Sequence, residues 1–202
     1  MPSRARKAGC TGASAAFVAL LSATTARAFE VEYSKVYYAD RRYHCDLVVV
    51  LAAPLDRVQA VLRDYERYPQ LDSRILRARV LERPAPDVVI LGTTLRACFG
   101  PFCRNVDRVE RVAELTHALV AITDPARSDV SFGETHTRLA PTADVDADRG
   151  ATRVSYSTSI APGFWLPAFV GRRWMLRTLQ GTTLQLFMNV EKEATQGSGR
   201  DP

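Results

Sequence analysis

The residue types that most often carry catalysis are thinly spread along this 202-residue chain. It contains no GxSxG, HExxH or P-loop pattern, so it lacks the common signatures of serine hydrolases, zinc proteases and nucleotide hydrolases. His136 follows Glu134 by two residues in a strand-like run, which makes it a candidate general base. The sequence identifies no partner for it, so an ordinary surface histidine is the alternative. We predict no catalytic residues and no cofactor, and we expect a binding protein more than an enzyme.

Two cysteines are spaced for a hairpin disulfide. Cys98 and Cys103 flank a Gly-Pro turn between two strand-like runs, a geometry that would bring them opposite each other. A bridge there closes a short loop and stabilises the fold by about 2 kcal/mol. Cys45 is then left over as a small buried residue. A zinc site usually needs a second pair of ligands besides two such cysteines. The three histidines are scattered and do not form that pair, so we predict no metal.

One cation interrupts the apolar face of a long C-terminal helix, which we predict from Leu166-Pro167 to about Glu193. At about 100° per residue, one face of this helix collects eight side chains: Phe169, Arg172, Leu176, Leu179, Thr183, Leu186, Phe187 and Val190. Most of this face is typical of a protein core. Arg172 would be a buried guanidinium there, and such a group needs a partner. It pairs with an acidic residue of a sheet, or it binds the polar head group of a ligand.

The first 28 residues are typical of a cleavable secretory signal peptide. A basic start precedes the short apolar run Ala13–Ser22, and Ala26-Arg27-Ala28 is a small-x-small cleavage signal. The apolar run is about half of the roughly 20 residues that a membrane-spanning helix needs. We therefore expect a periplasmic or secreted protein with a domain over residues 29–194 and a disordered tail over 195–202.

Removal of the signal peptide would also remove most of the net charge. Residues 1–28 hold four of the 27 basic residues and none of the 22 acidic ones, so the charge falls from +5 to about +1. The main argument for a nucleic-acid partner, a strongly basic chain, therefore no longer applies. Basic residues on the central strands are expected to form a solvated sheet face, interleaved with Asp107 and Glu110. These basic residues are Arg77, Arg79, Arg104, Arg108 and Arg111.

The rest of the chain is predicted to be mainly strands, with helices only after the first hairpin and at the C-terminal end. A hairpin (31–38 and 43–51) is followed by a helix (54–65) and a short helical turn near residue 71. Six strands then lead to the long helix, with a bulge expected at Gly92: residues 73–83, 88–99, 104–112, 117–123, 130–139 and 152–160. Without repeated βαβ units, the economical arrangement is an α+β fold in which one curved antiparallel sheet lies against the C-terminal helix.

Two stretches of the chain resemble a known superfamily. The first is Val48–Arg79 (VVVLAAPLDRVQAVLRDYERYPQLDSRILRAR); the second is Gly150–Tyr156, then Phe164–Pro167 and the helix with Asn189 and Glu191. They resemble the polyketide cyclase/START-like (SRPBCC) superfamily, in its coenzyme-Q-binding-protein and lipid-transport branch. The resemblance implies a helix-grip fold, in which a curved sheet holds a C-terminal helix around a ligand cavity.

The resemblance also implies where a ligand would lie. In the family, the loop before the long helix and the segment after the first helix flank the cavity entrance. The residues expected to touch a ligand are mostly aromatic: Tyr65, Tyr68, Leu71, Phe99, Phe102, Tyr156, Trp165, Phe169, Arg172 and Leu176. For the aromatic residues, ordinary core packing is the alternative.

Three functions follow from these patterns. The first is an exported carrier for a hydrophobic small molecule, lipid or quinone-like, working as a monomer with transient membrane contact. The second is a cyclase or dehydratase-type enzyme acting on an apolar ketide-like substrate, which requires polar groups converging inside the pocket. The third is a protein-interaction module. Export would separate such a module from cytosolic partners, so this function fits the signal peptide poorly.

Overall fold

The computed structural model describes residues 29–99, 102–142, 150–164 and 172–196. The strands are β1 (Glu30–Ala39), β2 (Arg42–Leu51), β3 (Ile75–Ala85), β4 (Val88–Phe99), β5 (Phe102–Leu115), β6 (Ala118–Thr123), β7 (Val130–Pro141) and β8 (Thr152–Pro162). The helices are α1 (Leu55–Arg63), α2 (Tyr68–Leu71) and α3 (Arg172–Gln196), with short 3₁₀ turns η1 (Tyr65–Arg67) and η2 (Pro125–Arg127). The predicted signal peptide and residues 197–202 of the predicted tail lie outside the described residues.

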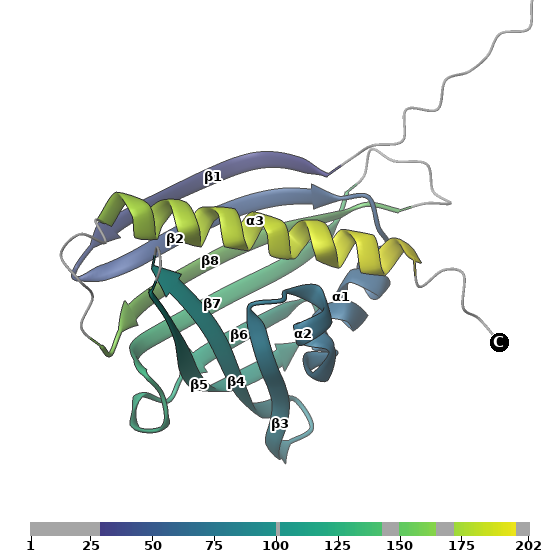
Figure 1. Ribbon diagram of the computed structural model, residues 1–202. Coiled ribbons are helices and arrows are strands. Elements are labelled where there is room, and N and C mark those ends of the chain that lie inside the picture. Colours follow the sequence, from purple (N-terminus) through teal and green to yellow (C-terminus); the bar gives the residue numbers. More distant parts are fainter. Residues whose placement is uncertain (1–28, 100–101, 143–149, 165–171, 197–202) are drawn as a thin grey trace, which may run out of the picture.

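The eight strands form one antiparallel sheet in the order β1-β2-β8-β7-β6-β5-β4-β3. The sheet is curved and does not close, and α3 lies across its concave side (Figure 1). The predicted α+β helix-grip fold is therefore confirmed. The strands fall where the alternation of apolar and polar residues predicts them, because each strand has one face toward the core.

Two details of the predicted strands are wrong. β3 continues through Pro84 instead of stopping there. This strand is an edge of the sheet, where a proline's missing N–H removes no necessary bond, and register shifts lie beside it. No register shift occurs at Gly92, where the sequence predicts a bulge.

α3 packs on only part of the sheet. Its contacts are mainly with β1, β2, α1 and α2, and few are with β3, β4 and β5. The buried side chains of the helix are Thr183, Phe187, Val190 and Ala194. The helix ends at Gln196, two residues into the predicted tail.

The C-terminal half of α3 is fixed by polar contacts as well as by packing. Glu191 Oε2 accepts a 2.9 Å hydrogen bond from the backbone N–H of Ala52, just after β2. Asn189 Nδ2 donates to the carbonyl of Leu71 at 2.6 Å. The main hydrophobic core lies at this end, where α1 and α2 fill the space between helix and sheet. These contacts fix the C-terminal half of α3 against β2 and α2.

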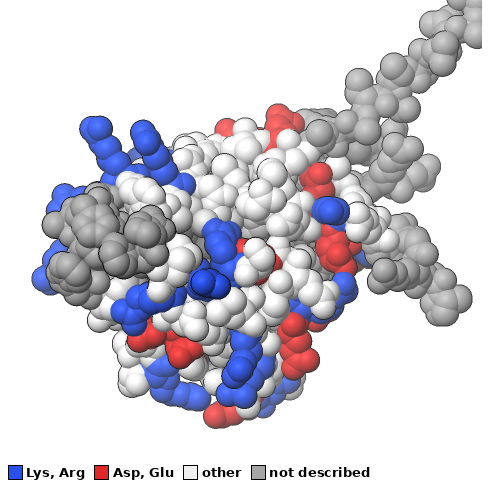
Figure 2. All heavy atoms as spheres, in the orientation of Figure 1, with Lys and Arg blue, Asp and Glu red and all other residues white. Residues whose placement is uncertain are grey.

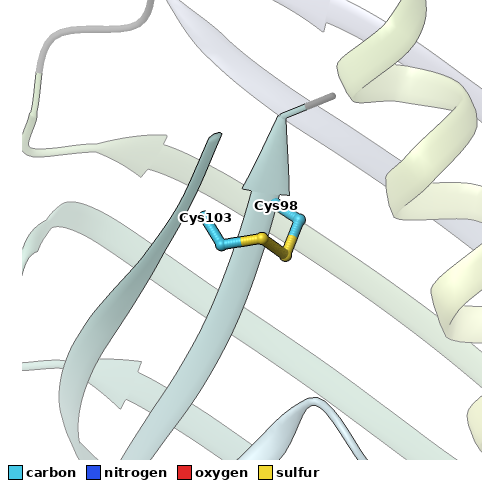
Figure 3. Close-up of a disulfide and its surroundings, with 2 residues drawn as sticks. All are labelled: Cys98 and Cys103. Carbon is cyan, nitrogen blue, oxygen red and sulfur yellow. A yellow bond between two sulfur atoms is a disulfide. The ribbon is translucent and has the colours of Figure 1, made fainter. Parts of the chain in front are cut away.

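The β4–β5 hairpin carries the disulfide. Cys98 and Cys103 are directly opposite each other across the two strands, and their sulfur atoms are joined at 2.06 Å (Figure 3). Cys45 is free and buried. The bridge ties together the last residues of β4 and the first of β5, so it restricts the tip of the hairpin.

Replacing both bridged cysteines with serine is expected to lower the free energy of unfolding by about 2 kcal/mol, because the closed loop is short. Chemical denaturation of the oxidised protein measures the change. Treating the unmodified protein with a reductant should reproduce it, while the double variant should not respond to reductant. A double variant as stable as the oxidised protein would show that the bridge does not constrain the unfolded chain.

Candidate functional site

The strand register decides which side chains face α3. Because side chains alternate, the inner face carries Leu47, Tyr156, Thr137 and Leu119 in one row across β2, β8, β7 and β6. Many inner-face residues are fully buried. Five inner-face residues, on β8, β7, β6 and β4, are only partly buried. This group is Tyr156, Thr135, Ala121, Thr93 and Leu95. These residues are therefore the inner-face positions that a small molecule could reach.

A charged pair lies on this inner face. Side chains alternate along β5, so Arg108 and Glu110 point to the same face of the sheet as Val106 and Val112, which are buried. Arg108 Nη2 lies 2.6 Å from Glu110 Oε1, and the side chains are 14% and 9% exposed. The strand neighbours of Glu110 are Leu91 of β4 and Thr123 of β6. The expectation of a solvated face is therefore wrong for both residues, because their parity directs them inward.

The guanidinium of Arg108 is held in place by its neighbours. Its Nε donates to Thr123 Oγ1 at 3.1 Å. A Cβ atom added at Gly133 would overlap Thr123 Oγ1 and would lie 3.1 Å from Arg108 Nη2. The absence of a side chain at Gly133 therefore makes the room in which these two groups meet.

Burial and charge shift the ionisation of this cluster. Burial raises the pKa of Glu110, and the positive charge of Arg108 opposes that rise. Burial also raises the pKa of Tyr156, on which Arg108 and Glu110 act with opposite signs. The Tyr156 ring packs edge-on against Phe187 of α3, with centroids 5.4 Å apart. Tyr156 therefore lies on the same inner face as the charged pair and packs against the helix.

The predicted residues after the first helix form part of the inner wall. Tyr68 donates its hydroxyl hydrogen to the carbonyl of Leu62 at 2.7 Å, and Tyr65 donates to Glu114 Oε1 at 2.8 Å. The two rings are edge-to-face, 5.6 Å apart. Burial is the largest cause of the raised pKa of Tyr68, and the charge of Glu110 adds to it. Leu71 is buried in the main core.

For the other predicted ligand contacts, the structure gives less detail. Leu176 lies on α3 with part of its surface accessible. Phe99 and Phe102 are strand residues at the tip of the β4–β5 hairpin, and their side chains lie outside the description, as do Trp165 and Phe169. Tyr65 and Leu71 thus belong to the main core, and Tyr68 and Tyr156 pack against it.

Arg172 is not the buried cation that the helical wheel predicts. It is exposed at the start of α3, and its guanidinium carbon lies 4.4 Å from the centre of the Tyr38 ring. This contact places the first turn of the described helix over the edge strand β1. The cation inside the grip is Arg108.

His136 lies on the outer face of the sheet. It pairs with Val120 and Ser157, one position away from the inward-facing Thr135 and Thr137. Its Nε2 is 2.8 Å from Glu134 Oε1, and both side chains are 43% exposed. A general base there could not reach a molecule held between sheet and helix.

A groove lies between α3 and the segment that leads into β3. It has a volume of about 510 Å³ and lies between Asp72–Arg74 and the α3 residues from Arg177 to Asn189. Arg74 pairs with Asp72 and also donates across the groove to the carbonyl of Thr182 at 3.5 Å. On the face drawn in Figure 2, basic and acidic side chains are interspersed instead of forming a single basic stripe.

Metal-binding clusters and membrane-spanning helices are absent from the part of the chain that the structure describes. Within those ranges, His, Cys, Asp and Glu side chains do not gather in groups that could hold a metal ion. Neither α3 nor another described helix has the length and apolar character needed to cross a bilayer.

Solved structures resemble this fold, although neither a family model nor a curated protein matches the sequence. A protein of Thermus thermophilus aligns with a TM-score of 0.63 at 16% identity, covering 77% of this chain and 99% of its own. A START superfamily protein from Mycobacterium smegmatis gives 0.58 at 18%, covering 76% and 97%. The Zhui aromatase/cyclase of a Streptomyces species gives 0.55 at 13%, covering 75% and 93%. The chain therefore has the START-like fold, shared with START proteins and polyketide aromatase/cyclases.

Proposed function

We propose that this protein binds an apolar small molecule, lipid or quinone-like, between the inner face of the sheet and α3. The observation that carries the proposal is the inner face itself. It presents partly accessible side chains toward the helix at Tyr156, Thr135 and Ala121, beside a sheet half that α3 does not cover. Ligand pockets are commonly concave and mostly apolar, with a few fixed polar groups, and the Arg108–Glu110 pair supplies such groups here.

The fold supports the proposal by analogy. The similar structures include a START superfamily protein and an aromatase/cyclase, and fold alone does not decide between such functions. The coenzyme-Q-binding and lipid-transport branch is our choice on the sequence resemblance of Val48–Arg79. A carrier of this kind would act as a monomer that touches a membrane when it loads or releases its ligand.

We also propose that the protein acts outside the cytoplasm, in the periplasm or as a secreted protein. The signal-peptide pattern of residues 1–28 supports this location. The Cys98–Cys103 disulfide adds support, since such bridges persist in oxidising compartments. Cell fractionation with mass determination of the N-terminus tests it, and an intact chain in the cytoplasm would overturn it.

A filled inner face is expected to abolish ligand uptake. Ala121 faces inward with part of its surface accessible, so Ala121→Trp places an indole in the proposed space. Its neighbour Ile122 faces outward and is 51% exposed, so Ile122→Trp is the matched control. We expect uptake of fluorescent fatty acids and quinones to fall at least about tenfold in the first variant only.

The same preparation allows a direct search for a natural ligand. Organic extraction of the purified protein followed by mass spectrometry should yield an apolar molecule that is depleted in Ala121→Trp and retained in Ile122→Trp. Absence of any extracted ligand together with absence of uptake would contradict the proposal. Equal uptake by both variants would place the ligand elsewhere.

A cyclase or dehydratase is the second candidate, and one observation favours it. Arg108, Glu110 and Tyr156 lie on the inner face, where an enzyme acting on a ketide-like substrate would need polar groups. An enzyme would convert a bound apolar poly-β-ketone into a cyclised or dehydrated product, whereas a carrier would return it unchanged. Product analysis after incubation separates the two functions.

A further inference from the structure

The groove between α3 and the start of β3 has a polar lining. It runs along α3 where the chain passes from α2 into β3 (Figure 1), and every described residue that lines it is polar or glycine. Its volume of about 510 Å³ is that of a small-molecule site, but sites for apolar ligands are lined mainly by apolar and aromatic side chains. The groove therefore suits a polar ligand. It shares no lining residue with the inner-face positions proposed above for an apolar ligand, so it is a separate site.

The groove carries one positive charge that no described carboxylate balances. Asp72 is the acidic residue among those that line it, and its Oδ1 already accepts from the backbone N–H of Arg74 at 3.0 Å and from the Arg74 Nε at 2.8 Å. Arg177 is exposed and forms no ion pair with a described residue. α3 has no acidic residue before Glu191. A ligand with one negative charge would therefore complement the groove.

Unused hydrogen-bonding groups lie in the same groove as Arg177. The hydroxyls of Ser73 and Thr178 form no hydrogen bond with another described residue. Gln185 donates its amide nitrogen to Asn189 at 3.1 Å, so its oxygen is left as an acceptor. A guanidinium can hold two phosphate oxygens in parallel, while hydroxyl and amide groups can pair with the hydroxyls of a ligand.

We propose that this groove binds a phosphodiester whose alcohol carries hydroxyl groups, as in glycerophosphoglycerol, in preference to one that carries a quaternary amine. The phosphodiester balances Arg177, and the alcohol pairs with the free hydroxyl and amide groups. A choline group would bring a second cation into the groove, and no described lining residue has an aromatic ring that could hold it. The same chemistry occurs in soluble glycerophosphodiesters and in the head group of phosphatidylglycerol.

Gly181 provides a direct test, because a Cβ atom added there meets no other atom within 4 Å. Gly181→Glu places a carboxylate in the groove one turn from Arg177, and glutamate favours the helix more than glycine does. Met188→Glu adds the same charge to α3 at an exposed position outside the groove, so it is the matched control.

Titration calorimetry with glycerophosphoglycerol and glycerophosphocholine measures the preference. We expect the unmodified protein to bind the first compound about tenfold more tightly than the second. Gly181→Glu should weaken binding of the first compound at least about tenfold, whereas Met188→Glu should leave it unchanged.

A pair of arginine variants distinguishes the groove from general attraction to basic residues. Arg177→Gln removes the unpaired cation of the groove, and Arg173→Gln removes an exposed cation one turn earlier that does not line it. The first variant should lose affinity for glycerophosphoglycerol, and the second should keep it. Equal losses in the two variants would overturn the proposal.

Vesicles identify the source of the phosphodiester. Co-sedimentation compares vesicles of phosphatidylcholine alone with vesicles that also contain phosphatidylglycerol. Binding to the mixed vesicles that is lost in Gly181→Glu and kept in Met188→Glu assigns the groove to the lipid head group. The same pattern with the soluble compound alone assigns it to a free glycerophosphodiester. If Gly181→Glu lowers neither kind of binding, or if neither occurs, the proposal is wrong, while uptake of apolar probes decides the proposed function independently.

Discussion

Replacing Arg108 alone with methionine is expected to lower the free energy of unfolding by about 3–5 kcal/mol. The change leaves the carboxylate of Glu110 buried without its counter-charge. Replacing both residues, in Arg108→Met with Glu110→Leu, removes both charges and should restore stability to within about 1 kcal/mol of the original. Chemical denaturation of the two single variants and the double variant gives the coupling between the residues.

The pH dependence of the single variant should show the same cause. Burial raises the pKa of Glu110, and Arg108 opposes that rise, so removing Arg108 raises the pKa further. A carboxyl with a raised pKa in the folded state stabilises the fold in acid and loses that contribution as the pH rises. The deficit of Arg108→Met should therefore be smaller at about pH 5 than at about pH 8.

Arg104 provides the control for this experiment. It lies on the same strand, but its side chain is 43% exposed and its ion pair with Asp129 is long, at 3.6 Å. Arg104→Met should therefore cost less than about 1 kcal/mol. Equal losses for Arg104→Met and Arg108→Met would mean that Arg108 is no more buried in solution than a surface arginine.

Truncating Phe187 to alanine should also cost about 3–5 kcal/mol. This side chain is 1% exposed and is the large aromatic residue through which α3 meets the sheet. Its ring packs edge-on against Tyr156, so truncation leaves a cavity in the centre of the grip as well as removing buried apolar surface.

Met188, the next residue along α3, is the matched comparison. It is 40% exposed, so Met188→Ala should change the free energy of unfolding by less than about 1 kcal/mol. Thermal or chemical denaturation measures both variants. A loss of under about 1 kcal/mol for Phe187→Ala would show that the helix is held mainly by its polar contacts at Glu191 and Asn189.

The order of helices and strands was predictable because it depends on local patterns. Strands with a period of two and helices with apolar residues on one face carry that information in short windows of sequence. The two-residue turn between β1 and β2 fell at Asp40 and Arg41, which both adopt positive φ, as a tight hairpin requires. The single sheet and its long helix followed from the order of these elements.

The charged site was missed because both faces of β5 carry charges. Asp107 and Arg111 lie on one face, and Arg108 and Glu110 lie on the other, so alternation alone assigns no inner face. The sequence did hold one indication: Arg108 and Glu110 lie on the same strand face as the apolar residues Val106 and Val112, which are buried. His136 was ambiguous for the same reason, since the inward-facing neighbours Thr135 and Thr137 are also polar.

Arg172 shows a different limit. The helical wheel placed it correctly in angle, on the same side as Phe187. It could not show that the first turn of α3 lies over the edge strand β1, where a cation stacked on Tyr38 stays in contact with water. Burial along a helix depends on what lies beneath each turn, and that depends on tertiary structure.

The strand order also constrains when the chain can fold. β1 and β2 join the other strands only through β8, so Asp46 and Ser157, 111 positions apart in sequence, must meet before these two strands are added to the sheet. Pairings over such separations slow folding, because the loop entropy is lost before the contacts form. The sheet of a nascent chain would therefore stay incomplete until almost all of the chain had been synthesised, a property that suits a protein threaded unfolded through a membrane, as we propose for this one.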